Sequence, residues 1–272
     1  YNKFQRIVFD KLGFKDAEIV SPSNDNAYED ISGGQGTRFR FLAWKGFVAV
    51  DILWKLRQER RPYELVRGET DRIYDEALQN VINSIEKGAK DLGDVLRESA
   101  RKFDAIAFSN GERKPVIVIV GEIFMRDNPF CSAFLVERLE KFGAETFISP
   151  FSEWLSYSTY RYTRDSLWKG DYKGVLKSKI QELSQNLSAG KLHKAVHGYI
   201  DMDREIPLRS MLSSCGKYIH RHYDGDPALN LGSSVELVKT GISGIVNILP
   251  FTCMPGTVVA SVSHKLKKDH NN

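Results

Sequence analysis

The stretch "PVIVIVGE", residues 115–122, decides the fold class of this 272-residue chain. Every residue from Val116 to Val120 is apolar, so both faces of a strand formed here would be buried. Strands buried on both faces are typical of parallel sheets with helices on either side, whereas antiparallel strands usually alternate apolar and polar residues. We therefore predict a parallel strand at 116–120 in an α/β protein.

The residues after this strand predict a βαβ unit. Asn128 followed by proline is a typical helix start, with asparagine as the N-cap and proline at the first helical position. We expect the helix to run to Phe142, with Cys131 in its core-facing part, and a strand to follow at 145–149. A unit of this kind is right-handed in nearly all known folds.

A helix-to-strand pattern recurs three times along the chain. Helical periods end in Lys-x-Gly at 11–13, 141–143 and 239–241, and the β-rich runs after them stop at Pro22, Pro150 and Pro250. Each copy alone fits an ordinary helix end, with lysine in the last turn and glycine after it. Three copies with the same continuation favour a repeated helix-to-strand unit, and therefore parallel sheets with helices on their faces.

The elements predict two Rossmann-like domains with short parallel sheets flanked by helices, the first of them incomplete. Helical patterns precede the strand at 39–60, 69–87 and 91–103. The polar turn 109–115 is a plausible boundary. Residues 1–112 would form a truncated, helix-rich α/β domain, and 113–272 a Rossmann-like domain with a helical insertion at about 161–200. Because helical patterns lie at both ends, we expect the chain to be a piece of a larger polypeptide.

Composition disfavours several classes of function. Lys and Arg number 39 against 35 Asp and Glu, with both signs interspersed, so no basic stripe predicts binding to nucleic acid. No apolar run approaches the roughly 20 residues that a membrane span needs. Three widely spaced cysteines do not form a secreted disulfide framework, which favours a reducing, cytoplasmic setting.

The candidate functional residues lie just after the predicted strands. Sites in open parallel sheets form at the carboxyl ends of the strands. The loops that meet this condition are Gly121–Asn128, Ser149–Glu153 and Pro250–Thr257. From these loops we predict Glu122, Arg126 and Glu153 as catalytic residues and Thr252 and Cys253 as cofactor-binding residues.

Cys253 is the candidate with the most specific position. It lies after a predicted strand and before a helix whose first turn holds Pro255. Free N–H groups and the helix dipole at such a place favour a thiolate, which can act as a nucleophile or bind iron. An inert cysteine in a tight turn is the alternative.

Three segments carry a resemblance to a known family. They are "VGEIFMRDNPFCSAFLVERLEKFGAETFISPFSEWLSY", "GIVNILPFTCMPGTVVAS" and "PYELVRGETDRIYDEAL". The chain resembles, over nearly its whole length, the proteins called acyl-CoA dehydratase activase-related, or CoA-substrate-specific enzyme activases. The stretch from Pro250 to Gly256, with Cys253 at its centre, is the most specific part of the resemblance.

The resemblance implies an iron–sulfur system. Large members of the family join an ATP-hydrolysing activase portion to a portion similar to the 2-hydroxyacyl-CoA dehydratase subunits and double-cubane cluster proteins. This chain resembles the second portion, and Cys253 falls on a cluster-ligand position. The family usually has a further cysteine loop upstream of the matching region.

The implied role is low-potential electron transfer. The expected partners are an ATP-hydrolysing activase portion or protein and an acyl-CoA substrate, without nucleic acid or membrane; a homodimer is left open. Two alternatives stay open as well: a subunit that dehydrates a 2-hydroxyacyl-CoA directly, and a noncatalytic docking domain.

Overall fold

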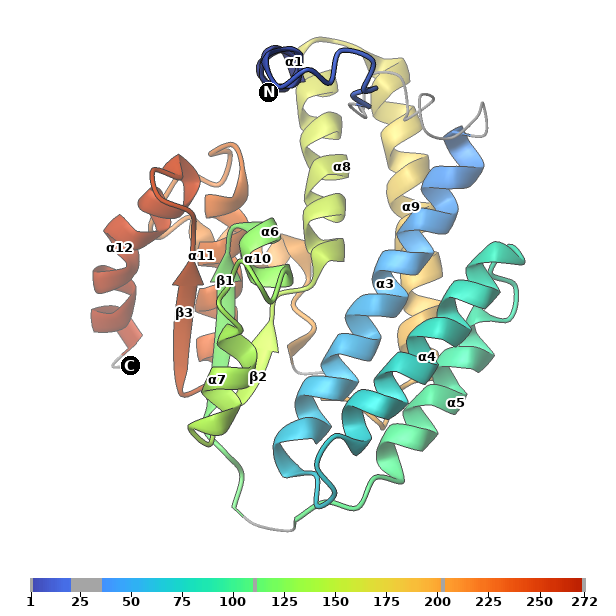
Figure 1. Cartoon of the computed structure of the whole chain (residues 1–272). Coiled ribbons are helices and arrows are strands. Elements are labelled where there is room, and N and C mark those ends of the chain that lie inside the picture. The colour runs from blue at the N-terminus through green and yellow to red at the C-terminus, as the bar shows by residue number, and fades with distance from the viewer. Residues whose placement is uncertain (1, 21–35, 110–111, 202–203, 271–272) are drawn as a thin grey trace. The chain divides into compact units, whose positions relative to one another are not determined.

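A computed structural model of the chain describes residues 2–20, 36–109, 112–201 and 204–270. It forms two compact units, Tyr1–Trp44 and Lys45–Asn272. The first unit contains α1 (Asn2–Lys11) and the start of α3 (Gly36–Arg60). The second contains the rest of α3 and the later elements (Figure 1): η1 (Arg61–Tyr63), α4 (Glu69–Glu86), α5 (Leu92–Asp104), β1 (Val116–Gly121), α6 (Ile123–Asp127), α7 (Leu135–Lys141), β2 (Glu145–Ile148), α8 (Phe151–Trp168), α9 (Tyr172–Ala195), α10 (Leu208–Cys215), α11 (Asp226–Val238), β3 (Gly244–Ile248) and α12 (Met254–His270).

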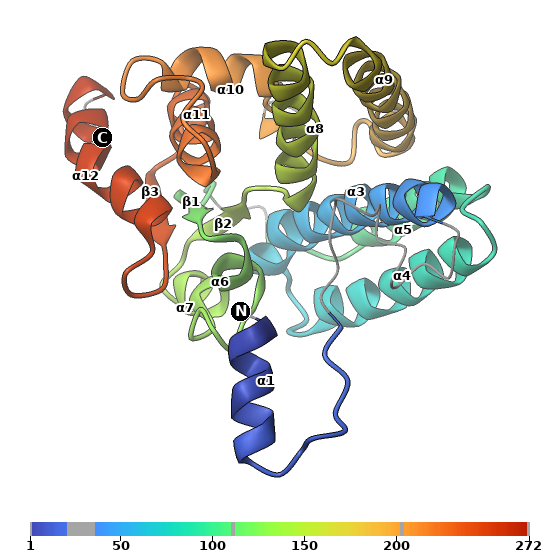
Figure 2. The ribbon, with the colours of Figure 1, turned by 90° about the horizontal axis from the view of Figure 1, so that it is seen from above.

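The described strands form one parallel sheet in the order β2-β1-β3. In its register, Val118 of β1 lies opposite Phe147 of β2 and Ile245 of β3. Figure 2 shows α10 and α11 on one face of the sheet and α6 and α7 on the other. The predicted strand 116–120 and the α/β class, with a short parallel sheet flanked by helices, are therefore confirmed. The finer prediction, two Rossmann-like domains divided near residue 112, stays a prediction.

The central strand is buried as its sequence predicts. Val118 and Val120 are fully buried and pack with Phe147 of β2 and Leu237 of α11. A second apolar cluster joins α8, α10, α11 and α12, and Cys215 is one of its buried members. These two cores fix the sheet against the helices and hold the carboxyl ends of all three strands at one edge.

Residues 45–109 add helices to the second unit. The three predicted helices are confirmed as α3, α4 and α5, which lie side by side in Figure 1. The rings of Trp54 on α3 and Tyr74 on α4 lie 5.9 Å apart, and Leu96 and Phe103 of α5 are fully buried. No helix in the described parts of the chain has the length and apolar character required to cross a membrane.

The repeated helix-to-strand pattern is confirmed in two of its three copies. After α7 and after α11 the chain turns at Gly143 and Gly241, which have φ of +89° and +81°, and then enters β2 and β3. The first copy is wrong. Gly13 has the same left-handed backbone, but residues 14–20 form no strand, and Pro22 lies outside the described residues.

The predicted helix that starts at Asn128 is also wrong. Asn128 instead ends α6, and its side chain accepts a hydrogen bond from the N–H of Cys131 in a turn. Ala133 and Phe134 adopt φ of +52° and +54°, which no α-helix accommodates, so α7 begins only at Leu135. Cys131 consequently lies half-exposed in this turn and not in a helix core.

The N-terminus of α8 is capped by a residue from another helix. The carboxylate of Asp51 on α3 accepts hydrogen bonds from the N–H groups of Phe151 (3.0 Å) and Ser152 (2.9 Å). This contact ties the helical layer to the carboxyl end of β2, which immediately precedes α8.

We predict that Asp51→Ala lowers the free energy of unfolding by about 1 kcal/mol, because two N–H groups at the start of α8 lose their acceptor. Chemical denaturation followed by circular dichroism measures the change. Asp75→Ala, at an exposed aspartate in the middle of α4, serves as the control. An equal loss in the two variants would contradict the capping role.

Candidate functional site

The carboxyl ends of β1 and β3 meet closely. Gly121, the last residue of β1, has φ of +124°, and a Cβ added to it would lie only 2.0 Å from the carbonyl oxygen of Ile248. The next N–H, from Glu122, donates to that same oxygen at 2.9 Å. Glycine is therefore required here, and it brings the loop after β1 against the loop that leads from β3 to Cys253.

Two predicted residues lie at the short helix after β1. The Glu122 carboxylate accepts a hydrogen bond from the N–H of Met125 at 2.8 Å and so caps α6. Arg126, one turn later, is only 6% exposed, and its Nη2 donates to the carbonyl oxygen of Pro150 at 3.4 Å. Arg126 thus connects the end of β1 to the end of β2, as the sheet topology predicts for loops at one edge.

Three carboxylates interact electrostatically with Arg126, namely Asp127, Glu153 and Asp226, and Glu122 interacts with two of them. We call these five residues the Arg126 cluster. Its Nε makes no hydrogen bond within the described residues and lies 3.8 Å from Asp127 Oδ1. A buried guanidinium needs nearby negative charge, and this cluster provides it. Glu122 caps the short helix that holds Arg126, and Glu153 interacts electrostatically with Arg126, so the three residues lie at the same edge of the sheet.

Among the residues of the Arg126 cluster, Glu153 has the pKa that is raised most. Burial of its carboxyl group raises the pKa to about 8; Arg126 opposes this shift, and the nearby carboxylates Glu205 and Asp51 add to it. Burial likewise raises the pKa of Asp51 to about 6. A glutamic acid that is protonated at neutral pH can donate a proton, so Glu153 could act as a general acid.

The charged residue Lys55, from α3, lies next to the carboxyl end of β2. Lys55 of α3 is buried, and its ammonium group forms an ion pair with Glu205 at 2.9 Å. Together with Asp51, Gln58 and Asp127, these residues line a narrow cavity of about 30 Å³. Asp51, Lys55 and Glu205 also influence the Glu153 carboxyl group electrostatically. Charged groups therefore continue from the Arg126 cluster into the interior of the second unit.

Cys253 and Thr252 lie at the same edge, in the loop after β3. The carbonyl oxygen of Cys253 accepts a hydrogen bond from the N–H of Thr257 at 2.9 Å, so Cys253 stands at the start of α12 as predicted. Its side chain is half-buried. Thr252 adopts φ of +66°, which is costly for a β-branched residue and is found mainly where surrounding structure or function requires it. In the described residues, no hydrogen bond or ion pair joins Cys253 to the Arg126 cluster.

A complete iron–sulfur site does not fit the cysteines of this chain. Clusters are usually held by about four thiolates. Cys215 donates its S–H to the carbonyl oxygen of Leu212, and burial raises its pKa to about 11, so it is unsuited as a ligand. Within the ranges that the structure describes, no three His, Cys, Asp or Glu side chains are grouped to hold a metal ion. Cys253 could therefore supply only one ligand of a set completed from elsewhere.

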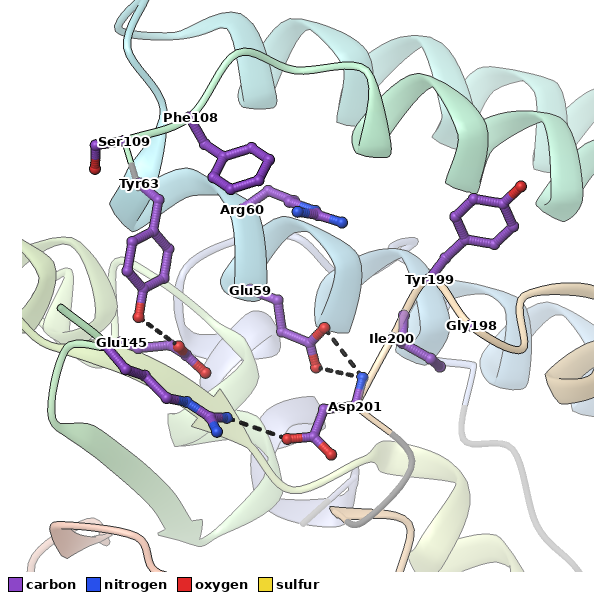
Figure 3. Close-up of a pocket in the computed structure, with 11 residues that line it drawn as sticks. Glu59, Arg60, Tyr63, Phe108, Ser109, Glu145, Gly198, Tyr199, Ile200 and Asp201 are labelled. Carbon is purple, nitrogen blue, oxygen red and sulfur yellow. Dashed lines mark hydrogen bonds and ion pairs between the residues drawn. The ribbon is translucent and has the colours of Figure 1, made fainter. Parts of the chain in front are cut away.

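A larger cavity lies at the opposite, amino edge of the sheet. It has a volume of about 520 Å³. In Figure 3 the carboxyl group of Glu59 points to the backbone N–H of Asp201, and the hydroxyl of Tyr63 points to Glu145, the first residue of β2. The corresponding distances are 3.2 Å and 2.8 Å. Burial raises the pKa of Glu59 to about 7, with Lys55 opposing the shift. No sequence pattern predicted this cavity.

The residues that enclose the candidate site were not predicted from the sequence. Asp51, Lys55 and Glu205 come from segments far from the predicted loops, and Asp226 begins α11. One signal was present for Asp51, because it interrupts the apolar run "FVAVDILW" in the middle of a helix. A lone carboxylate on an apolar helix needs a partner, and here the partner is the N-terminus of α8.

No family model, curated protein or solved structure matches this chain at a level that indicates relationship.

Proposed function

We propose that this chain is the dehydratase-like portion of an ATP-dependent iron–sulfur system for low-potential electron transfer, and that Cys253 contributes one thiolate ligand to its cluster. The observation that carries the proposal is the position of Cys253. It is a half-buried thiol at the start of α12, at the carboxyl edge of a parallel sheet. Sites in α/β proteins form at that edge. Its neighbour Thr252 is held in a costly backbone conformation.

The surface around Cys253 supports a partner at this edge. Phe251 is 96% exposed, and Met254 on the other side of Cys253 is also exposed. Phe124 and Phe130 are exposed in the neighbouring segment after β1. Exposed apolar side chains on both sides of Cys253 in the chain suit a surface that another protein covers. An ATP-hydrolysing activase portion or protein would fit here and could carry the missing thiolates.

The proposal includes the finer expectations for the chain. They are two Rossmann-like domains, a cytoplasmic location, and Glu122, Arg126 and Glu153 as the residues that act on an acyl-CoA substrate. A direct 2-hydroxyacyl-CoA dehydratase is the second candidate, and the raised pKa of Glu153 favours it. A glutamic acid protonated at neutral pH could protonate a leaving hydroxyl group. Turnover of a 2-hydroxyacyl-CoA by the purified protein would separate the two candidates.

Cluster binding is testable with the cysteines themselves. We expect the protein, purified anaerobically together with its partner subunits, to contain iron and sulfide that Cys253→Ser removes and Cys131→Ser leaves in place. The two thiols are a matched pair, because both are half-buried and lie in turns. Iron and acid-labile sulfide analysis gives the readout. Iron retained at the same level in Cys253→Ser would contradict the proposed ligand.

Alkylation provides a second readout of the same prediction. Without denaturant, iodoacetamide should modify Cys131 and Cys253 and spare Cys215, which is buried and has a raised pKa. Cluster loading should protect Cys253 alone. Mass spectrometry of the alkylated peptides measures this, and equal protection of Cys131 and Cys253 would indicate general occlusion instead of ligation.

A further inference from the structure

Helix α9 turns four of its large apolar residues away from the rest of the protein. Leu176, Ile180, Leu183 and Leu187 are 65%, 61%, 59% and 59% exposed. They succeed one another at intervals of four, three and four residues, so they form one continuous stripe along the helix. We call these four residues the α9 seam.

The opposite face of α9, which packs on α8, is small and polar. Thr163 of α8 donates a hydrogen bond to Ser178 Oγ at 2.8 Å, and Gln181 donates to Thr159 Oγ1 at 3.2 Å. Gly174 and Ser178 are among the buried residues of α9. A surface helix normally buries its apolar stripe and exposes its polar face. Over residues 174–188, α9 does the reverse, which is the pattern of a helix whose apolar face is meant for a partner.

The spacing of the α9 seam indicates that the partner is a helix. Alternating intervals of four and three residues are the heptad spacing of a coiled coil, in which Ile180 and Leu187 occupy a positions and Leu176 and Leu183 occupy d positions. The seam covers roughly 17 Å of helix at a rise of 1.5 Å per residue. A second helix laid along it would bury all four side chains together.

The charged residues beside the α9 seam indicate which partner helix would bind there. Lys177 and Lys179 occupy the e and g positions that flank the seam, and both are exposed. Glu182 is the single acidic residue in the sequence of α9, and it pairs with Lys179 at 2.7 Å. Residues at e and g set the choice of partner in coiled coils through opposite charge. A second copy of α9 would bring the same excess of lysine, so like charge disfavours it.

We propose that the α9 seam binds an amphipathic helix of a partner protein, with an apolar heptad face flanked by glutamate or aspartate. This interface lies on different residues from the candidate site and does not depend on the function proposed for Cys253.

The test uses two synthetic helices as probes. Both carry Ile at a and Leu at d; one has Glu at every e and g position, and the other has Lys there. With the 272-residue chain at low salt, fluorescence anisotropy should give a Kd at least about tenfold lower for the acidic helix. Leu183→Asp should weaken that binding at least about tenfold, whereas Leu65→Asp, at a similarly exposed leucine outside α9, should leave it unchanged.

A charge-swap variant keeps the test independent of folding defects. Lys177→Glu combined with Lys179→Glu leaves the α9 seam intact and should reverse the preference, so that the basic helix binds better. Circular dichroism confirms the helical content of each variant. Equal binding of both probes, or binding of neither, would overturn the proposal. It would also be overturned by a dimer of the chain that Leu183→Asp dissociates and the acidic helix does not, since a second copy would then occupy the seam.

Discussion

Gly121→Ala is expected to lower the free energy of unfolding by about 3–5 kcal/mol, whereas Gly143→Ala should lower it by only about 1 kcal/mol. Both glycines have a left-handed backbone, with φ of +124° and +89°. Alanine is therefore strained in both variants. The surroundings differ as well, because a Cβ at Gly143 meets nothing within 4 Å.

At Gly121 the three atoms nearest to the added Cβ are all backbone atoms of Ile248 in β3. The Cβ would lie 2.0 Å from the oxygen and 2.7 Å from the nitrogen of Ile248, and neither atom can rotate away as a side chain could. The ends of β1 and β3 must then separate, which breaks the hydrogen bond from the Glu122 N–H to Ile248. Breaking such a buried bond adds roughly 1–3 kcal/mol to the backbone strain.

Chemical denaturation of the two variants side by side measures this difference. The separation of β1 and β3 also moves the loop that holds Cys253. We therefore expect Gly121→Ala to change the rate at which iodoacetamide modifies Cys253, and Gly143→Ala to leave that rate unchanged. Equal destabilisation by the two substitutions would show that the contact with Ile248 is not a constraint on the sheet.

The sequence predicted those parts of the fold that depend on local patterns. The run Val116–Val120 is apolar throughout, and this property alone requires burial on both faces and hence a parallel strand between helices. Parallel strands bring their carboxyl ends to one edge of the sheet. The sequence alone therefore predicts that the loops holding Glu122, Arg126 and Glu153 lie at the same edge. In the structure, Arg126 contacts the carbonyl oxygen of Pro150, so the loops after β1 and β2 do meet at this edge.

The errors arose where a local sequence pattern is compatible with more than one structure. Asn128 followed by proline is a good helix start, but the asparagine instead accepts a hydrogen bond within a turn, and the left-handed backbone at Phe134 delays the helix. The enclosure of the Arg126 cluster also has no local signature. It depends on Asp51, about one hundred residues before the helix that it caps. The strand expected after Gly13 failed for a related reason, because a glycine C-cap ends a helix without specifying the next element.

Glu153→Gln is expected to stabilise the chain at pH 8 and to have little effect at pH 4. In the folded chain, burial raises the Glu153 pKa to about 8, whereas in the unfolded chain the carboxyl group titrates near its ordinary pKa of 4.5. The folded state therefore retains a proton that the unfolded state releases between these values. The free energy of unfolding of the native protein therefore falls as pH rises from 4.5 to 8. Over this range the unfolded chain gains by releasing the proton, whereas the folded chain must either keep the proton or bury a charged carboxylate.

Glutamine keeps the size of the side chain but cannot ionise, so the variant escapes this loss. Since Glu153 is partly exposed and Arg126 compensates its charge, we expect a gain on the order of 2 kcal/mol at pH 8, less than the full shift would give. The free energy of unfolding, measured by denaturation at several pH values, should diverge from that of the native protein above pH 4.5. Glu98→Gln, at an exposed glutamate of α5, should run parallel to the native protein throughout. Destabilisation by Glu153→Gln at pH 8 would mean that the carboxylate is ionised and is required by Arg126. Glu153 would then be a fixed counter-charge and could not serve as an acid at neutral pH.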